Sequence, residues 1–280
     1  MSADEDKPRV RPVLFLTALA VATLSAFPIW FMATSAFKAE PEIMAIPIHW
    51  WPRDFQWFAR FRQAAAFAPL WHYFFNSSVF SVTHVVVTVF FGALAGFGFA
   101  KYRFPGRTIL FYFVICTLMI PFQVLVVPLF IQVKGFGWEN TYAGLITPGL
   151  MNAFGVFMMR QYASDLPDEL LEAGRIDGAG EFFIFTRIVL PLLAPGLTSL
   201  AIIVFIWSWG AFLWPLVIVQ DRALNVLSVG LTNYSQPYQQ APMWGAAMAA
   251  ATVATIPIAC LFAFFQRYFI KGLTAAAVKG

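Results

Sequence analysis

The chain has 280 residues, of which 60% are hydrophobic and 11% are charged. Soluble domains carry about 25% charged residues, so this composition excludes an ordinary soluble fold and indicates a membrane protein. The formal net charge of +4 is modest and comes with no basic cluster, so nucleic acid is not indicated as a partner.

A helix needs about 20 apolar residues to cross a bilayer. Six stretches meet or approach this length, namely residues 13–35, 79–100, 108–127, 143–159, 197–219 and 246–265. Alternating ten-residue segments typical of a membrane β-barrel do not occur. We therefore expect an all-α integral membrane protein with six transmembrane helices. The first stretch is too long for the apolar part of a signal peptide, so we expect a retained anchor.

Lys and Arg are concentrated on one side of the predicted spans. If the N-terminus lies inside, the inner segments hold twelve of these residues and the outer segments hold six. The positive-inside rule then places both termini in the cytoplasm. Residues 1–12 form a charged inner tail. Residues 36–75 form the longest outer segment, which is rich in Trp and Pro and either lies at the lipid–water boundary or contacts an extracytoplasmic partner.

Three features inside the spans predict local structure. Gly92 and Gly96 are four residues apart, which favours a tight helix crossing within the chain. Pro121 predicts a kink in the third span. His84 lies inside the second span, where a histidine is either a functional residue or a packing residue with a satisfied hydrogen bond.

The chain lacks the residues of an enzyme or of an ion-coupled carrier. It has no Walker A motif and no catalytic cluster, and its three histidines and two cysteines show no metal-ligand spacing. No Asp, Glu or Lys lies within the six spans, although ion-coupled carriers usually need such groups near the midplane. The sequence thus predicts neither a catalytic nor a metal site, and transport energy must come from elsewhere unless the chain is a passive pore.

A polar loop follows the fourth span. Six of the fourteen acidic residues lie between Arg160 and Arg187, where the net charge is −3. Asp165 is a plausible N-cap of a short helix, and Pro167 is tolerated in its first turn. Gly178 and Gly180 should end this helix, and a second one should begin near Glu181.

The composition of this loop indicates what it binds. Leu166, Leu170 and Ala173 would share one apolar face of the first helix. A lipid-bound interfacial helix favours basic residues, whereas this segment is acidic. We therefore expect a protein partner on the inner side of the membrane.

The same loop carries a family motif. Glu172-Ala173-Gly174, then Gly178, then Ile188-x-Leu190-Pro191, resembles the EAA signature of ABC-importer permeases, with glycine replacing the third residue. Further matches resemble the MalG-type permease of carbohydrate importers, and they are Asn76-Ser77, Phe104-Pro105-Gly106, Ile120-Pro121, Val127-Pro128-Leu129, Asn140-Thr141 and Gln266-Arg267-Tyr268-Phe269. Gly210 and Ala211 depart from the family, which often has Asn and an acidic residue there.

The resemblance implies a type I ABC-importer permease fold and a domain layout. Residues 1–12 would be the cytoplasmic tail, and 13–75 the first transmembrane helix with a periplasmic segment. Residues 76–268 would form the permease core, including the coupling loop 163–192, and 269–280 would form the cytoplasmic C-terminal tail. The protein would lie in the bacterial inner membrane.

The resemblance also implies partners and site residues. The partners would be a MalF-like permease, a MalK-like ATPase dimer that binds ATP–Mg, and a periplasmic or lipid-anchored solute-binding protein; this chain itself would hold no cofactor. The residues that couple to the ATPase would be Glu172, Ala173, Gly174, Asp177, Gly178, Ala179, Ile188, Leu190 and Pro191. The tail residues that contact it would be Val278, Lys279 and Gly280.

Two other functions stay open from the sequence. The same architecture could serve another solute, such as glycerol phosphate or a polyamine. An ATP-independent channel or carrier is the alternative of a different class, and it would leave the acidic loop unexplained.

Overall fold

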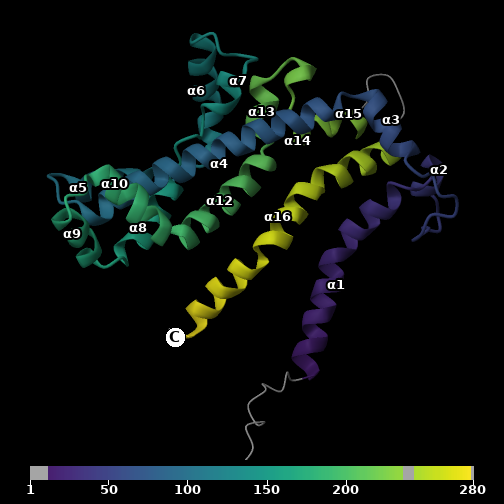
Figure 1. Ribbon diagram of the computed structural model, residues 1–280. Coiled ribbons are helices and arrows are strands. Elements are labelled where there is room, and N and C mark those ends of the chain that lie inside the picture. Colours follow the sequence, from purple (N-terminus) through teal and green to yellow (C-terminus); the bar gives the residue numbers. More distant parts are fainter. Residues whose placement is uncertain (1–11, 236–242, 279–280) are drawn as a thin grey trace, which may run out of the picture. The chain divides into compact units, whose positions relative to one another are not determined.

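The computed structural model describes residues 12–235 and 243–278 (Figure 1). Every regular element within these ranges is a helix, as the composition predicts. The chain divides into two units, one made of the residues up to 68 with 231–255, the other of 69–230 with the residues from 256 onwards.

The first unit contains the N-terminal span and the long predicted outer segment. Its helices are α1 (Pro12–Ser35), α2 (Glu40–Ile43), α3 (Ala59–Phe67), α15 (Thr232–Ser235) and the first part of α16 (Trp244–Val278). The apolar window of α1 has none of its residues buried within the chain, so its surface is suited to lipid. In the outer segment Trp50, Trp51 and Trp57 are exposed, which fits either a position at the lipid–water boundary or contact with a partner.

The second unit contains the predicted permease core. Its helices before the loop are α4 (Leu70–Lys101), α5 (Arg107–Thr117), α6 (Phe122–Gly135), α7 (Tyr142–Ile146) and α8 (Ala153–Ser164). The loop and the chain after it form α9 (Asp168–Ile176), α10 (Glu181–Phe183), the π-helix η1 (Ile184–Val189), α11 (Leu190–Leu192), α12 (Ala194–Trp209), α13 (Leu213–Ile218), the 3₁₀ turn η2 (Arg222–Leu224) and α14 (Leu227–Gly230).

The spans are more broken than the hydropathy pattern predicts. Among the described residues α1, α4 and the Trp244–Gln266 part of α16 are long and apolar enough to cross a membrane. Two bent pairs raise this number to five if each pair is one span: α5 with α6 at 96°, and Glu181–Leu192 with α12 at 78°. The predicted kink at Pro121 falls at the first of these bends. The count of six stays a prediction.

The predicted fourth span, residues 143–159, is two helices rather than one. α7 ends at Ile146 and α8 begins at Ala153, with Pro148 and Gly149 between them. Gly149 has a φ of +91°, a left-handed conformation that ends helical geometry. Hydropathy cannot detect such a break, because both sides of it are apolar.

Helices α4 and α8 cross with their backbones close together at two glycines of α4. A Cβ atom added to Gly96 would lie 2.6 Å from the backbone nitrogen of Arg160, and one added to Gly92 would lie 3.1 Å from the carbonyl carbon of Gly155. Only glycine allows the two backbones to approach this closely. The predicted tight crossing within the chain is thus confirmed.

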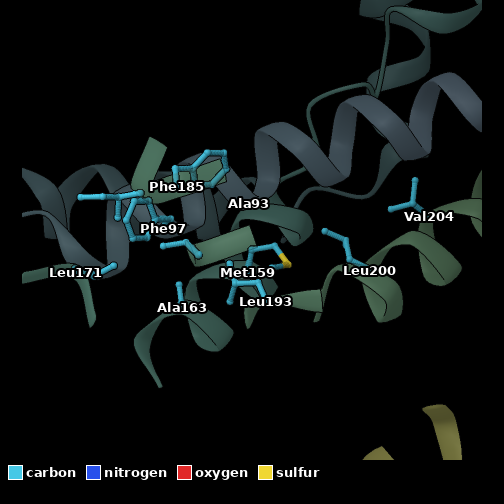
Figure 2. Packing of buried hydrophobic residues seen from close by; sticks show 11 residues of the cluster. Ala93, Phe97, Met159, Ala163, Leu171, Phe185, Leu193, Leu200 and Val204 are labelled. Carbon is cyan, nitrogen blue, oxygen red and sulfur yellow. The ribbon is translucent and has the colours of Figure 1, made fainter. Parts of the chain in front are cut away.

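A hydrophobic core joins this helix pair to the acidic loop. Figure 2 shows its eleven buried side chains, which come from α4, α8, α9, η1 and α12 and from residue 193 between α11 and α12. The members are Ala93, Phe97, Met159, Ala163, Leu171, Ile184, Phe185, Val189, Leu193, Leu200 and Val204. Phe97 and Phe185 stack with their ring centroids 5.7 Å apart. The loop is therefore packed onto the rest of its unit.

Candidate functional site

The first helix of the acidic loop begins later than its sequence predicts. α9 runs from Asp168 to Ile176, and Pro167 precedes it in an extended conformation. The predicted cap is wrong, because Asp165 is the C-cap of α8 and has helical backbone angles. Asp168 and Glu169 instead place negative charge in the first turn, where the helix dipole favours it.

A glycine corner ends α9, as predicted. Gly178 has a φ of +79°, and its N–H donates to the carbonyl of Arg175 at 3.0 Å. The N–H of Ala179 donates to the carbonyl of Gly174, also at 3.0 Å. These two bonds form a Schellman motif, which satisfies carbonyls at the helix end. The second helical segment then begins at Glu181.

The inward face of α9 is made by Leu171 and Gly174. Leu171 is 3% exposed within the hydrophobic core. A Cβ atom added to Gly174 would lie 3.1 Å from the Cδ1 atom of Ile188, so glycine allows α9 to lie close to η1. Ile188 and Leu190 are partly buried against the same core. The motif residues Gly174, Ile188 and Leu190 thus shape the loop and anchor it on the core.

The predicted apolar face of this helix is wrong. Leu170 is 42% exposed and Ala173 is exposed, while Leu166 is half-buried ahead of the helix. Within α9 the buried positions are Leu171 and Gly174, each one residue later than Leu170 and Ala173, which is a rotation of about 100° around the helix axis. The hydropathy pattern could not reveal this rotation, because Gly174 is buried without having a hydrophobic side chain.

The C-terminal end of α4, which the sequence predicts to lie on the inner side, binds the start of the loop. The Lys101 Nζ atom donates to the Asp168 Oδ1 atom at 2.6 Å and also to the carbonyl oxygen of Leu166. The hydrogen bond and the charge of Lys101 lower the pKa of the Asp168 carboxyl below its usual range.

Tyr102, the residue directly after α4, binds the far side of the loop. The Tyr102 hydroxyl donates to Glu181, which also accepts from Arg175 at 2.7 Å and 3.2 Å. The Arg175 hydrogen bonds, followed by that of Tyr102, lower the pKa of Glu181. Burial, followed by the nearby Glu181 carboxylate, raises the pKa of Tyr102. We call Lys101, Tyr102, Asp168, Arg175 and Glu181 the inner clasp.

The outward side of the loop carries charge and apolar groups without internal partners. No hydrogen bond or ion pair joins the side chain of Glu172 or Asp177 to another residue in the described part of the chain. Ile176 is 86% exposed, and Phe182 and Phe183 are 68% and 54% exposed. We call these five residues the acidic–apolar face. Large exposed apolar side chains grouped in this way indicate an interaction surface.

The structure divides the predicted site residues by exposure. Glu172, Ala173, Asp177, Gly178 and Pro191 are exposed; Ala179, Ile188 and Leu190 are half-buried; Gly174 is buried. Val278 is the last residue of α16, while Lys279 and Gly280 lie outside the described residues. The predicted role of the C-terminal tail therefore stays a prediction.

Sequence reasoning missed the inner clasp and the apolar half of the outward face. Lys101 and Tyr102 stand 67 and 79 residues from their partners Asp168 and Glu181, so no local pattern joins them. Ile176 did carry a signal, because it is a large apolar residue at the polar end of an acidic helix.

Comparison with known proteins identifies the family. Residues 88–275 match the family model described as "Binding-protein-dependent transport system inner membrane component". A permease protein of an arabinooligosaccharide transport system, AraQ of Halalkalibacterium halodurans, is 37% identical over 265 residues, covering 93% of this chain and 93% of that protein. UgpE of Brucella abortus, a permease protein of an sn-glycerol-3-phosphate transport system, is 30% identical over 276 residues, covering 96% of this chain and 98% of that protein.

A solved structure has the same fold. It is a chain from the crystal structure of a bacterial ABC transporter that imports the acidic polysaccharide alginate, with a TM-score of 0.83 at 20% identity. The match covers 96% of this chain and 99% of that one, which extends the likeness in fold to nearly the whole length of both. The chain belongs to the family of binding-protein-dependent transport system inner membrane components.

Proposed function

We propose that this chain is a permease subunit of an ATP-driven ABC importer for carbohydrates in the bacterial inner membrane. Its partners are a second permease, an ATPase dimer that binds ATP–Mg, and a solute-binding protein. Both of its termini are cytoplasmic, which the distribution of Lys and Arg supports. The relatives in sugar transport support the carbohydrate assignment, since AraQ belongs to an arabinooligosaccharide system.

The acidic–apolar face is the observation that carries the proposal. Among the described residues Glu172 and Asp177 have no hydrogen-bond or ion-pair partner, and the apolar side chains of Ile176 and Phe182 in the same loop are exposed. A partner with a basic group and an apolar pocket would satisfy both halves of this surface. The ATPase subunit is that partner in our proposal, and α9 is the coupling helix that seats on it.

The inner clasp gives a physical route from this face to the membrane. The loop is tied to the end of α4 through Lys101 and Tyr102, and its underside is packed on Phe97 through Leu171 and Phe185. A closed ATPase dimer that displaces α9 must therefore displace α4 with it. Because packed cores switch between arrangements rather than deform, this displacement proceeds as a rigid-body movement that alternates access to the pathway.

Glycerol phosphate is the second candidate cargo, favoured by the similarity to UgpE over 96% of the chain. It leaves the coupling role of the loop unchanged. Glycerol phosphate is charged and a saccharide is neutral, so the charge and hydrogen-bonding groups that line the pathway can distinguish the two cargoes.

Charge reversal at Glu172 tests the coupling role. Loss of one partner of a buried interfacial charge pair costs about 2–5 kcal/mol, so Glu172→Lys should weaken binding of the ATPase at least roughly 30-fold. The measurement is co-purification of the ATPase with the permease pair, together with ATP-driven uptake in proteoliposomes.

Asp54→Lys is the matched control. Asp54 is exposed in the predicted periplasmic segment and undergoes the same change of charge. It should leave ATPase binding unchanged. If the Glu172→Lys complex keeps its ATPase and transports at the normal rate, the acidic–apolar face is not the docking surface.

A further inference from the structure

The second unit contains a cavity away from the acidic loop. It has a volume of about 290 Å³ and lies between α4, the break between α7 and α8, and the α12–α13 segment. This volume is just below the range of about 300–1,000 Å³ for ligand pockets, which is suited to one ring of a larger ligand. His84, the intramembrane histidine of the sequence, lines it.

Aromatic rings form much of the wall. Five of the lining residues are aromatic, and three of these keep substantial exposed surface: Trp207 at 51%, Phe212 at 41% and Phe122 at 40%. The Trp207 ring is held edge-on by Phe154, with the ring centroids 5.1 Å apart. Rigid, exposed aromatic faces suit the apolar C–H faces of sugar rings.

Two side chains offer unused hydrogen-bonding groups of opposite kind. The Nε2 atom of His84 lies 3.0 Å from the carbonyl oxygen of Ile146, and since a carbonyl can only accept, Nε2 carries the proton. This tautomer leaves Nδ1 as an acceptor. The Oδ1 atom of Asn152 accepts from the N–H of Phe154 at 2.8 Å, which leaves its amide group as a donor.

The remaining polar groups are mainly acceptors. The hydroxyls of Thr88 and Ser208 donate to backbone carbonyls at 2.8 Å and 2.7 Å, so each keeps oxygen lone pairs for a ligand. The Nε1–H group of Trp207 makes no hydrogen bond to the described residues and adds one neutral donor. The wall thus presents two neutral donors and three acceptors.

The balance of these groups selects among ligand chemistries. No Asp, Glu, Lys or Arg is among the described residues that line the cavity. A phosphate mainly accepts hydrogen bonds and is bound by cations or several converging donors. A sugar hydroxyl both donates and accepts, so it can use the histidine, threonine and serine acceptors as well as the two donors.

We propose that this cavity is a cargo-contact site of this subunit, which binds one ring of a neutral saccharide by stacking on Trp207 and by hydrogen bonds to His84 and Asn152. The proposal rests on the proposed function, because it takes the cargo to be a carbohydrate. The cavity wall includes α4, the helix whose inner end the clasp ties to the coupling loop. A movement of the loop that displaces α4 would therefore reach the wall of the cavity.

Saturation-transfer NMR on the assembled permease–ATPase complex, without the binding protein, tests this site. The probes are arabinotriose and sn-glycerol 3-phosphate at equal concentration. Arabinotriose should receive saturation from the complex and sn-glycerol 3-phosphate should receive none. Loss of an aromatic contact of roughly 0.5–1.5 kcal/mol should weaken arabinotriose binding about 2- to 13-fold in Trp207→Ala.

Two further variants separate the site from general damage. Trp207→Phe retains an aromatic face and should recover most of the binding. Trp71→Ala removes a tryptophan that is 75% exposed and stacks on Phe74 outside the cavity, and it should bind like wild type.

The outcomes distinguish this proposal from the proposed function. Saturation of sn-glycerol 3-phosphate by the wild-type complex, which needs no variant to fold, would overturn the neutral-saccharide site. Equal arabinotriose binding in wild type and Trp207→Ala would also overturn it, and in both cases ATP-driven uptake would leave the importer function standing. A complex with no ATP-dependent uptake and no bound ATPase would instead refute the proposed function.

Discussion

Replacement of Gly178 by valine tests whether the shape of the glycine corner is what the partner recognises. Gly178 has a φ of +79°, and a Cβ atom added there would meet no heavy atom within 4 Å. The Cβ atom of valine would therefore meet no clash, and we expect its effect to come from the backbone. A left-handed conformation costs a residue with a side chain roughly 1–2 kcal/mol, with β-branched residues at the upper end.

Alternatively, the valine at position 178 leaves the left-handed conformation. It would then lose the two corner hydrogen bonds to the carbonyls of Arg175 and Gly174, which contribute about 1 kcal/mol each. Either route costs about 2 kcal/mol, which corresponds to a roughly 30-fold smaller population of the native corner. This is less than the stability of a typical domain, so the protein should stay folded while the corner opens.

Hydrogen exchange measures how often the glycine corner opens, and cargo-stimulated ATP hydrolysis measures whether the corner still couples to the ATPase. The amides of residues 178 and 179 should exchange up to about 30-fold faster in Gly178→Val, and stimulation of the ATPase by cargo should fall with them. Gly178→Asn should lie close to wild type, because asparagine tolerates the left-handed region.

Gly180 provides the matched control two residues away. It is also in open space, but its φ of −71° and ψ of 156° suit any residue. Gly180→Val should leave exchange and coupling unchanged. If both valine variants have the same effect, or if Gly178→Val behaves like wild type, the left-handed corner is not the recognised feature.

Two further predictions concern packing and pH. Gly96→Val places side-chain atoms within 2.6 Å of the α8 backbone and should lower the melting temperature in detergent strongly, whereas Gly98→Val, with nothing within 4 Å, should not; equal melting temperatures would contradict the close crossing. Lys101 lowers the pKa of Asp168, and Arg175 lowers the pKa of Glu181. The stability that the inner clasp provides is therefore fully present above the ordinary carboxyl pKa of about 4. It is lost as the pH falls through the lower pKa values that these two carboxyls have in the folded protein. The protection factors of the α9 amides, which correct for the pH dependence of intrinsic exchange, should fall below about pH 4, and a loop equally protected at pH 3 and pH 6 would contradict this.

The sequence predicted the parts of this molecule that depend on local chemistry. The first span agrees with α1 within one residue, because length and hydropathy are sufficient for an isolated apolar helix. The glycine corner at Gly178 and the start at Glu181 were predictable, since glycine tolerance of positive φ and an acidic first turn are properties of the residues themselves.

Features set by tertiary contacts were not predictable in the same way. The break between α7 and α8 is a different case, because Pro148-Gly149 is a local turn signal that a hydropathy window overlooks among apolar residues. The prediction of the buried face of α9 was wrong because glycine at 174 lets the α9 backbone lie close to the Ile188 side chain, and a hydropathy pattern does not register this role. The clasp between Lys101 and Asp168 joins residues 67 positions apart, which a single sequence does not relate.

The glycine crossing divides α4 into two arms of unequal length. Gly96 lies five residues from Lys101 and twelve from His84, which at 1.5 Å per residue gives arms of about 7.5 Å and about 18 Å. If a rigid α4 pivots at the Gly96 contact, a 1 Å shift at Lys101 becomes a shift of roughly 2.4 Å, in the opposite direction, at His84. A pivot at the Gly92 contact, which lies nine residues from Lys101 and eight from His84, would give roughly 0.9 Å. Which of the two glycine contacts acts as the pivot would thus decide how far a movement of the loop is transmitted along α4.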